Sequence, residues 1–509
     1  MRALSSRLQA AGLLALGILV TSTTAAAPKG RVGPQTPRAA PRFVAAACPP
    51  DVRPTGPDST WMTCGYVRVP QDREHPSAKL APIDLPVVVY KSPSATSPEP
   101  VVFIAGGPGD PAVSVVARAF LTTPVGQLLA REHVIIGFNQ RGAGAASTGT
   151  APDLGILAYR WRATRDESVK TLADSARLVA RRHRENGIQL QNFTTLQGID
   201  DIADVTRALG YERMILFGVS YGTRTALQFM NRHPESVVAA ILDGVAPPSR
   251  IGLFDIGRIE DRRRLVASQL VDDCLQAPTC REEYSDLRQL TDSLGRADAP
   301  PLSLIVNMAE NGGWTTLHVS GRDLLSAIGA YASGGSSRSA LPQLLDDLAR
   351  GDTLRRPLSP QFAMQVVYAL AVSKAAGPHY PVVYHVIICG DDPGGVSQAG
   401  GRSVCDALGV KFDGPDAVVA VNSDIPTLLL SGEYDAQTPS EFAEEAKRTL
   451  ATSYHVRFPG IGHLAFNRPT SAPCVALVVH AFLAAPKIAP PTDCAAAVVP
   501  AFLPRSSNP

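Results

Sequence analysis

The chain has 509 residues, and its charges nearly cancel, with 48 lysines and arginines against 46 aspartates and glutamates. A hydrophobic fraction of 45% is enough to fill a large core, and no repeat period or long low-complexity tract interrupts the sequence. One large domain carrying an inserted subdomain is therefore expected. Because no basic block stands out, nucleic acid and anionic membranes are not expected as partners, and a small or neutral substrate fits better.

The first 27 residues have the order of a secretory signal peptide. Arg2 and Arg7 form a basic start, residues 10–20 are apolar, and residues 25–27 are alanines suited to cleavage. The apolar run is too short to span a bilayer. Since the first cysteine is Cys48, no lipid-attachment cysteine follows this run. We expect export to the periplasm or the medium without a membrane anchor; a buried N-terminal helix is the alternative.

Eight cysteines fall into four couples that are close in sequence, and none has the CxxC spacing of a zinc site or redox pair. An even number of cysteines in an exported chain favours local disulfides over buried free thiols. Neither a metal nor another cofactor is expected. Proximity predicts the links Cys48–Cys64, Cys274–Cys280, Cys389–Cys405 and Cys474–Cys494.

The first half of the chain has the hydrophobic pattern of a buried sheet. Residues 28–47, rich in proline, alanine and arginine, are expected to form a mobile leader. A hairpin-like start over 66–90 opens the segment 48–247. Short apolar runs separated by helix-length segments follow, at 101–104, 134–136, 214–217 and 237–242. Runs of this kind predict a mostly parallel sheet that is buried on both faces.

Strand signals nearly vanish over 248–392, where helical periodicity dominates, and they return at 427–430 and 455–458. We therefore predict a helical cap over 248–392. The second part of the sheet domain is expected over 393–495, followed by a tail over 496–509. A cap that covers the carboxyl ends of the strands would shape the substrate pocket and exclude water from it.

Residues 218–222, Gly-Val-Ser-Tyr-Gly, carry the clearest chemical signal. They follow the run 214–217 and precede a helix-capable stretch, so Ser220 lies on a strand-to-helix turn whose glycines permit a strained backbone. An ordinary turn of this kind is the alternative. The context favours Ser220 as a nucleophile that forms a covalent acyl-enzyme.

A serine nucleophile needs a histidine base, which in this kind of site comes late in the chain. His463 is favoured because it lies in a glycine-rich loop after a strand. His455 begins that strand and His480 lies in an apolar helical run, so structural roles are expected for both.

The base in turn needs a carboxylate that orients it. Asp435 is favoured because it follows the strand 427–430 and leaves room for one helix and one strand before His463. The other candidate, Asp243, ends the strand 237–242 and is expected to fix a loop.

The oxyanion that forms on attack needs preorganised N–H donors. Tyr221, directly after the nucleophile, supplies one. The turn Gly106-Gly107-Pro108-Gly109 directly follows the strand 101–104, and Gly107 is expected to supply the other. A plain tight turn is the alternative interpretation of these four residues.

These motifs together resemble the secreted tripeptidyl aminopeptidase branch of the proline iminopeptidase family of α/β-hydrolases. The resemblance covers roughly residues 48–495 and includes Cys64-Gly65-Tyr66-Val67-Arg68-Val69-Pro70, Asn139-Gln140-Arg141-Gly142-Ala143-Gly144, Ser431-Gly432-Glu433-Tyr434-Asp435 and Gly462-His463. It implies an α/β-hydrolase fold with an inserted helical cap, in which Ser220, Asp435 and His463 form the triad and Gly107 and Tyr221 the oxyanion hole. The implied activity is release of short peptides or single residues from a free N-terminus. Asn139 departs from the aspartate usual in the family, at a position expected to be structural.

Two other classes of function remain open from the sequence. An esterase or lipase-like enzyme would use the same triad, because Ser-His-Asp chemistry cleaves esters and amides alike. A non-catalytic binding protein would be expected to have lost part of the triad, yet all three members are present. A dehalogenase or an epoxide hydrolase would need a carboxylate at position 220.

An aminopeptidase must also recognise a cationic chain end, because a buried unpaired ammonium group is costly. Carboxylates in the cap and at its return to the sheet are therefore candidates for binding the substrate amine. The candidates are Glu282, Glu283, Asp391 and Asp392, of which the last two are favoured. The alternatives are a solvated helix face for the glutamates and a turn before Pro393 for the aspartates.

Overall fold

The computed structural model describes residues 41–49, 52, 60–144, 167–252, 256–308, 313–334, 338–350, 382–393 and 401–503. The predicted signal peptide, most of the leader and residues 504–509 of the tail lie outside these ranges, as does the segment 351–381.

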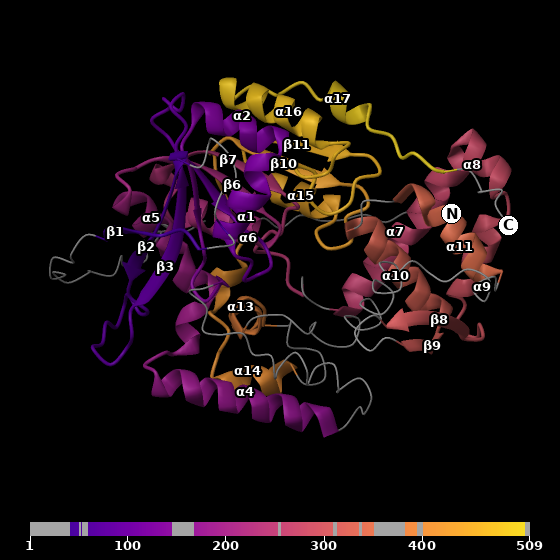
Figure 1. The fold of residues 1–509 in the computed structure, drawn as a ribbon, viewed down its shortest axis with the longest axis horizontal. Helices are drawn as coiled ribbons and strands as arrows, with labels where there is room; N and C mark the ends of the chain where they lie inside the picture. Colours follow the sequence, from indigo (N-terminus) through magenta and orange to yellow (C-terminus); the bar gives the residue numbers. More distant parts are fainter. Residues whose placement is uncertain are drawn as a thin grey trace, which may run out of the picture. The chain divides into compact units, whose positions relative to one another are not determined.

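A nine-stranded sheet forms the centre of the described chain (Figure 1). Its order is β1 (Phe43–Ala46), β2 (Met62–Val69), β3 (Ile83–Tyr90), β5 (Ile135–Phe138), β4 (Val101–Ile104), β6 (Met214–Val219), β7 (Val237–Asp243), β10 (Thr427–Gly432) and β11 (Ser453–Phe458). The pairs from β5 through β11 are parallel, and β1, β2 and β3 join antiparallel. The mostly parallel sheet predicted from the sequence is confirmed.

The central strands read as continuous apolar runs because both faces of the sheet are covered. Successive side chains point to opposite faces, so Val102 and Leu216 enter one hydrophobic cluster while Phe103 and Phe217 enter the other. The first cluster includes residues of α4 (Glu167–Glu185), α5 (Thr195–Ala208), α6 (Tyr221–Arg232), α13 (Val382–Asp391), α14 (Gly401–Leu408) and α15 (Ser440–Lys447). The second includes residues of α1 (Ala112–Arg118), α2 (Pro124–Glu132), α16 (Ala472–Ala484) and α17 (Asp493–Ala496).

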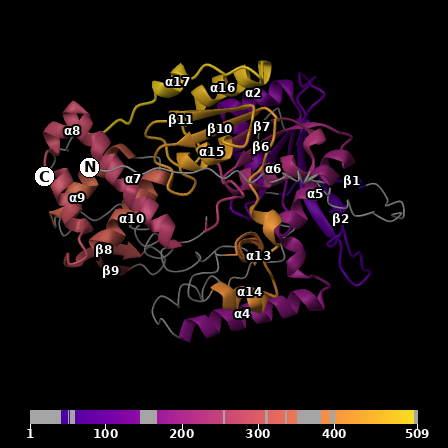
Figure 2. The ribbon, with the colours of Figure 1, turned by 180° about the vertical axis from the view of Figure 1, so that it is seen from behind.

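A separate hydrophobic cluster organises the segment between β7 and β10. Its elements are α7 (Ile256–Gln276), α8 (Pro278–Glu283), α9 (Leu287–Gly295), α10 (Gly321–Gly334) and α11 (Leu341–Ala349). The sequence predicted a helical cap here. It did not predict β8 (Leu302–Met308) and β9 (Gly313–Val319), which form a two-stranded antiparallel sheet of their own. α13 falls within the predicted cap range, but several of its buried residues belong to the first hydrophobic cluster, on one face of the large sheet. α14 contacts α4 (Figure 2).

Short 3₁₀ turns connect several of these elements, namely Phe120–Thr122, Leu190–Phe193, Pro234–Ser236, Arg338–Ala340 and Pro415–Val418. Among the described helices, none alone is long and apolar enough to cross a membrane, and one sharply bent pair, Ala112–Thr122 with Pro124–Glu132, meets that test of length and composition.

The last residues of the predicted mobile leader, 28–47, form regular structure instead. Phe43–Ala46 form β1, which pairs with β2, so these four residues belong to the sheet. Gly65 permits the close pairing, because a Cβ there would lie 2.2 Å from the Val44 carbonyl oxygen. The disulfide Cys48–Cys64 holds the same junction.

All eight cysteines are paired as predicted from the sequence. The Cα–Cα distances of the four links lie between 5.0 and 5.6 Å, a range in which a disulfide needs no backbone movement.

Candidate active site

Ser220 lies on a sharp turn between β6 and α6, with φ 54° and ψ −126°. Such a backbone is unfavourable for a residue with a side chain and persists where the surroundings fix it. The Ser220 amide donates to the Asp243 carbonyl oxygen at 2.9 Å. A Cβ on Gly222 would lie 2.2 Å from the Ile104 carbonyl oxygen, so only glycine permits this close approach of α6 to β4. The strained turn has the geometry of a nucleophile elbow.

His463 and Asp435 are brought together by the loops after β11 and β10. The Nδ1 atom of His463 lies 2.8 Å from Oδ2 of Asp435, and both side chains are buried. The other Asp435 oxygen accepts from the amides of Gln437 and Thr438, each at 2.9 Å. Burial raises the pKa of Asp435, but His463 and the Thr438 hydrogen bonds outweigh it and hold the pKa below its ordinary value. The carboxylate therefore stays ionised and fixes the imidazole ring.

Asp243 has a different place in the site. Its two carboxylate oxygens accept from the amides of Ala465 at 3.0 Å and Phe466 at 2.8 Å, so it fixes the loop that carries His463. Burial raises the pKa of Asp243 to about 6, against the opposing effect of these two hydrogen bonds. The loop-fixing interpretation of the sequence matches this geometry.

The turn 106–109 packs directly on the nucleophile. A Cβ on Gly106 would lie 2.9 Å from Ser220 Cβ and 3.4 Å from Ser220 Oγ, so the turn needs glycine there. Gly107 has φ 105°, which favours glycine as well. The Gln140 side chain donates to the Ala105 carbonyl oxygen at 3.0 Å and supports the entry to this turn.

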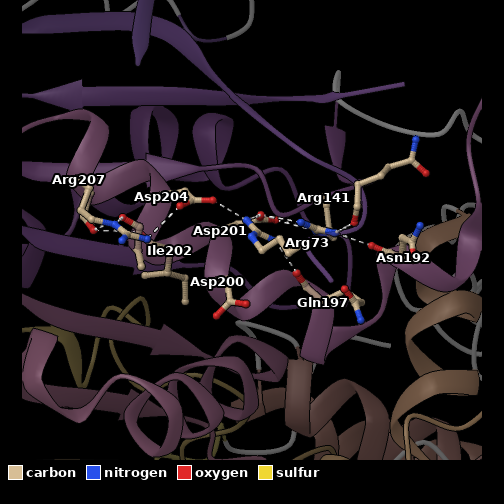
Figure 3. Close-up of polar contacts among 12 residues, drawn as sticks. Arg73, Arg141, Asn192, Gln197, Asp200, Asp201, Ile202, Asp204 and Arg207 are labelled. Atoms are coloured by element: carbon tan, nitrogen blue, oxygen red, sulfur yellow. Dashed lines mark hydrogen bonds and ion pairs between the residues drawn. The ribbon is translucent and has the colours of Figure 1, made fainter. Parts of the chain in front are cut away.

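The segment 139–144 is a structural support for the turn. Asn139 Oδ1 accepts from the Val113 amide at 3.0 Å, at the start of α1. Arg141 is fully buried and forms two hydrogen bonds with Asp201, at 2.8 and 2.7 Å (Figure 3). Arg73 binds the same carboxylate from the other side, which gives a buried network between the loops and α5. The structural role expected for Asn139 fits these contacts.

The four carboxylates predicted to bind the substrate amine lie in different surroundings. Asp391 is fully buried, accepts from Thr195 Oγ1 at 2.7 Å and pairs with Arg224 at 3.0 Å. Asp392 is buried as well and accepts from the Gly252 amide at 2.6 Å. Glu282 and Glu283 lie on α8, with Glu282 exposed and Glu283 half-buried. Neither aspartate presents its carboxylate to solvent, because both are buried and hold protein partners. A role of Glu282 or Glu283 in binding an ammonium group stays a prediction.

Thr195 links Asp391 to the residue after the nucleophile. Its hydroxyl oxygen lies 2.5 Å from the Tyr221 hydroxyl, in a buried chain that holds the Tyr221 side chain away from solvent. Burial raises the pKa of Tyr221 far above its usual range, so the phenol stays neutral. The backbone N–H of Tyr221 is the group predicted to act on the oxyanion.

The other two late histidines have structural partners. His455, within β11, contacts Ser431 Oγ at 2.7 Å and Glu444 at 2.6 Å. His480, on α16, lies 3.9 Å from Glu132. Within the described ranges, no group of three or more His, Cys, Asp or Glu side chains is arranged to hold a metal ion.

Reasoning from the sequence missed Asp110, which follows the turn 106–109. A Cβ on Gly107 would lie 3.3 Å from Asp110 Cγ, so the carboxyl group folds back over the turn. Asp110 is exposed to solvent on one side. The protein atoms around its carboxyl group partly desolvate it and raise its pKa, while His463 acts in the opposite direction. An acidic residue directly after the Gly-Gly-Pro-Gly run was the signal available in the sequence.

Comparisons with known proteins indicate the same fold. Residues 99–305 match the family described as alpha/beta hydrolase fold, and residues 394–494 match the family described as TAP-like protein. A tripeptidyl aminopeptidase of Streptomyces coelicolor is 25% identical over 194 residues, 37% of this chain and 36% of the relative. The serine protease Hip1 of Mycobacterium tuberculosis is 26% identical over 196 residues, 36% of each protein.

The chain thus matches little more than a third of the length of these curated relatives. Among solved structures, the proline iminopeptidase of Mycobacterium smegmatis shares 18% sequence identity with a TM-score of 0.38, over 83% of this chain and 98% of that one. The two family matches together span more than half of the sequence and include Ser220, Asp435 and His463. The chain therefore has an α/β-hydrolase fold, and its region 394–494 is similar to the TAP-like family.

Proposed function

We propose that the protein is an exported serine exopeptidase that releases short peptides or single residues from free N-termini. The observation that carries the proposal is the buried His463–Asp435 pair, together with the strained turn that holds Ser220. The names of the relatives, a tripeptidyl aminopeptidase and a serine protease, support peptide bonds as the target. Four disulfides support an oxidising compartment as its place of action.

In the proposed mechanism, Ser220 Oγ attacks the scissile carbonyl carbon while its proton moves to Nε2 of His463. Nδ1 of His463 is held by Asp435, which stabilises the imidazolium that forms. The backbone N–H groups of Gly107 and Tyr221 stabilise the oxyanion. The tetrahedral intermediate then collapses, the C–N bond breaks, and His463 returns the proton to the leaving amine.

Water then hydrolyses the acyl-enzyme, with water as the nucleophile and Ser220 as the leaving group. His463 removes a proton from a water molecule, which attacks the acyl-enzyme carbonyl carbon. The C–O bond to Ser220 breaks, and His463 returns the proton to Ser220 Oγ. No group beyond the chain and water is needed to balance the reaction.

The proposal is tested by comparing aminoacyl and peptidyl nitroanilides with acyl nitrophenyl esters. We expect hydrolysis of the nitroanilides, near-complete loss of turnover in Ser220→Ala, and labelling of Ser220 by a fluorophosphonate in the intact enzyme. Substantial hydrolysis by a folded Ser220→Ala protein would contradict the assignment of Ser220 as the nucleophile. Turnover of esters alone would favour the second candidate, a carboxylic ester hydrolase on the same scaffold.

A further inference from the structure

We propose that Asp110 binds the α-ammonium group of the substrate and that the bond cleaved lies one residue from the N-terminus. This inference rests on the proposed function and selects between the product lengths that the proposed function leaves open.

The position of Asp110 connects it directly to the reacting groups. The Cγ atom of Asp110 lies 3.3 Å from the position that a Cβ on Gly107 would occupy, and the Asp110 amide donates to the Gly106 carbonyl oxygen at 3.3 Å. Gly106 itself packs against Ser220 Oγ. One tight turn therefore carries both the predicted oxyanion donor and a carboxyl group.

In the described part of the chain, Asp110 differs from the other aspartates near the triad in having no hydrogen-bond or ion-pair partner for its carboxyl group. Asp435 accepts from His463 and Thr438, Asp243 from two backbone amides, and Asp391 is paired with Arg224. Across the residues that the structure describes, Asp110 makes no side-chain hydrogen bond or ion pair, while its carboxyl group interacts electrostatically with His463. An accessible carboxyl group at the site thus retains its full capacity to accept hydrogen bonds.

A free α-amino group is the complementary ligand, because it is largely protonated at neutral pH and donates three hydrogen bonds. A carboxylate beside the oxyanion donor also repels the negative charge that develops on the substrate oxygen. A bound ammonium group cancels this repulsion, whereas an acetylated N-terminus leaves it in place. The same carboxylate therefore favours free N-termini and disfavours blocked ones.

The place of Asp110 also limits the length of the acyl group. In an aminoacyl group the nitrogen lies about 2.5 Å from the carbonyl carbon, because a single Cα separates them. In an extended tripeptide the terminal nitrogen lies roughly 7 Å further away. Because the carboxyl group folds over the turn that holds the oxyanion donor, it meets the ammonium group of the residue under attack.

The test compares alanine nitroanilide, its N-acetylated derivative and a trialanine nitroanilide in the wild type and in Asp110→Asn. The wild type should prefer alanine nitroanilide to both other substrates. Asp110→Asn should lower kcat/KM for the free aminoacyl substrate by about 30-fold or more. The same substitution should raise kcat/KM for the N-acetylated derivative. Asp110→Glu should restore part of the preference, and Glu282→Gln, an exposed acid on α8, is the matched control.

Fluorophosphonate labelling of Ser220 in Asp110→Asn reports whether the nucleophile is intact. A labelled Asp110→Asn enzyme that keeps the wild-type preference for free amines would overturn the role of Asp110 and leave the exopeptidase proposal standing. Preferential cleavage of the trialanine substrate by the wild type would overturn the assigned length. Hydrolysis of esters without any nitroanilide would overturn the proposed function itself and this inference with it.

Discussion

Two buried aspartates near His463 have opposite pKa shifts because their surroundings differ. Asp435 is paired with His463 and accepts three further hydrogen bonds from Gln437 and Thr438, and its pKa is lowered. Asp243 has two backbone amides and lies within the field of Asp435, and burial raises its pKa to about 6. The first arrangement keeps a charge in place for catalysis, and the second fixes a loop.

Replacing each aspartate by asparagine should separate these roles. Asp435→Asn should lower kcat by about 10³–10⁴-fold, because the amide no longer holds His463 in the required tautomer. Asp243→Asn should mainly lower the free energy of unfolding, by about 1–3 kcal/mol, because one backbone amide then faces an NH₂ group. Steady-state kinetics and denaturant unfolding measure the two effects. Full activity in Asp435→Asn beside an inactive Asp243→Asn would move the acid role to Asp243.

Asp413 gives a pH-dependent test of stability. Burial raises its pKa to about 7, so the folded state keeps a proton that the unfolded chain releases near pH 4. The contribution of this group to folding therefore falls as pH rises from about 4 to 7 and stays low above that range.

Asp413→Asn, which mimics the protonated form, should raise Tm at pH 8 by roughly 2–4 °C and change it little at pH 4. Thermal unfolding at both values checks this expectation. Asp416→Asn, three residues along at an exposed position, is the control. An equal shift of Tm at both pH values would contradict the linkage to Asp413.

At the level of elements, the carboxyl end of α10 supports both the acid and the base loops. The Ser333 carbonyl oxygen accepts from the His463 amide at 2.7 Å, and Ser333 Oγ accepts from the Ala436 amide at 3.1 Å. Arg468 donates to the His463 carbonyl oxygen through Nε and Nη2, and to the Gly334 carbonyl oxygen through Nη1. The helix, the base loop and the acid loop therefore form one hydrogen-bonded junction.

Arg468→Met should weaken this junction while keeping much of the side-chain bulk. We expect kcat to fall about tenfold with little change in KM, because the base loop loses its donors and no substrate contact is removed. Arg448→Met, at an exposed position, is the control. A large rise in KM with unchanged kcat would show that Arg468 acts on substrate binding instead.

The elements also show how far the sequence predicts this structure. Continuous apolar runs predicted β4, β6 and β10, because a sheet buried on both faces needs them. β8 and β9 were missed, since they pair only with each other amid helical periodicity. The cationic partner of Asp391 is Arg224, 167 residues away, so the burial of that carboxylate depends on tertiary contacts. Asp110 was missed because its direction follows from the backbone path at Gly107.

At the scale of the whole molecule, the four disulfides each close a short loop in a different part of the chain. The sequence separations run from 6 residues for Cys274–Cys280 to 20 for Cys474–Cys494. In the chain-entropy account a longer loop restricts the unfolded chain more. The disulfide Cys474–Cys494, which joins α16 to α17, is therefore expected to stabilise the fold more than Cys274–Cys280, which joins α7 to α8.

Replacing both cysteines of a link by alanine should follow this order. Loss of Cys474–Cys494 should cost about 3 kcal/mol and loss of Cys274–Cys280 about 2 kcal/mol. Denaturant unfolding without reductant measures both values, and peptide mapping without reduction should recover all four links in the wild type. Recovery of free thiols at most positions would contradict the pairing and remove a support for export.

The order of strands in the sheet has a consequence for biosynthesis. Ser220 and Gly107 follow strands that are made early, whereas Asp435 and His463 follow β10 and β11, which complete one edge of the sheet last. A nascent chain that has reached β7 holds a nucleophile without its base or its acid. Since synthesis proceeds from the N-terminus, the proposed peptidase acquires its activity only when nearly the whole chain has been made. Unfinished chains are thus expected to lack the proposed peptidase activity.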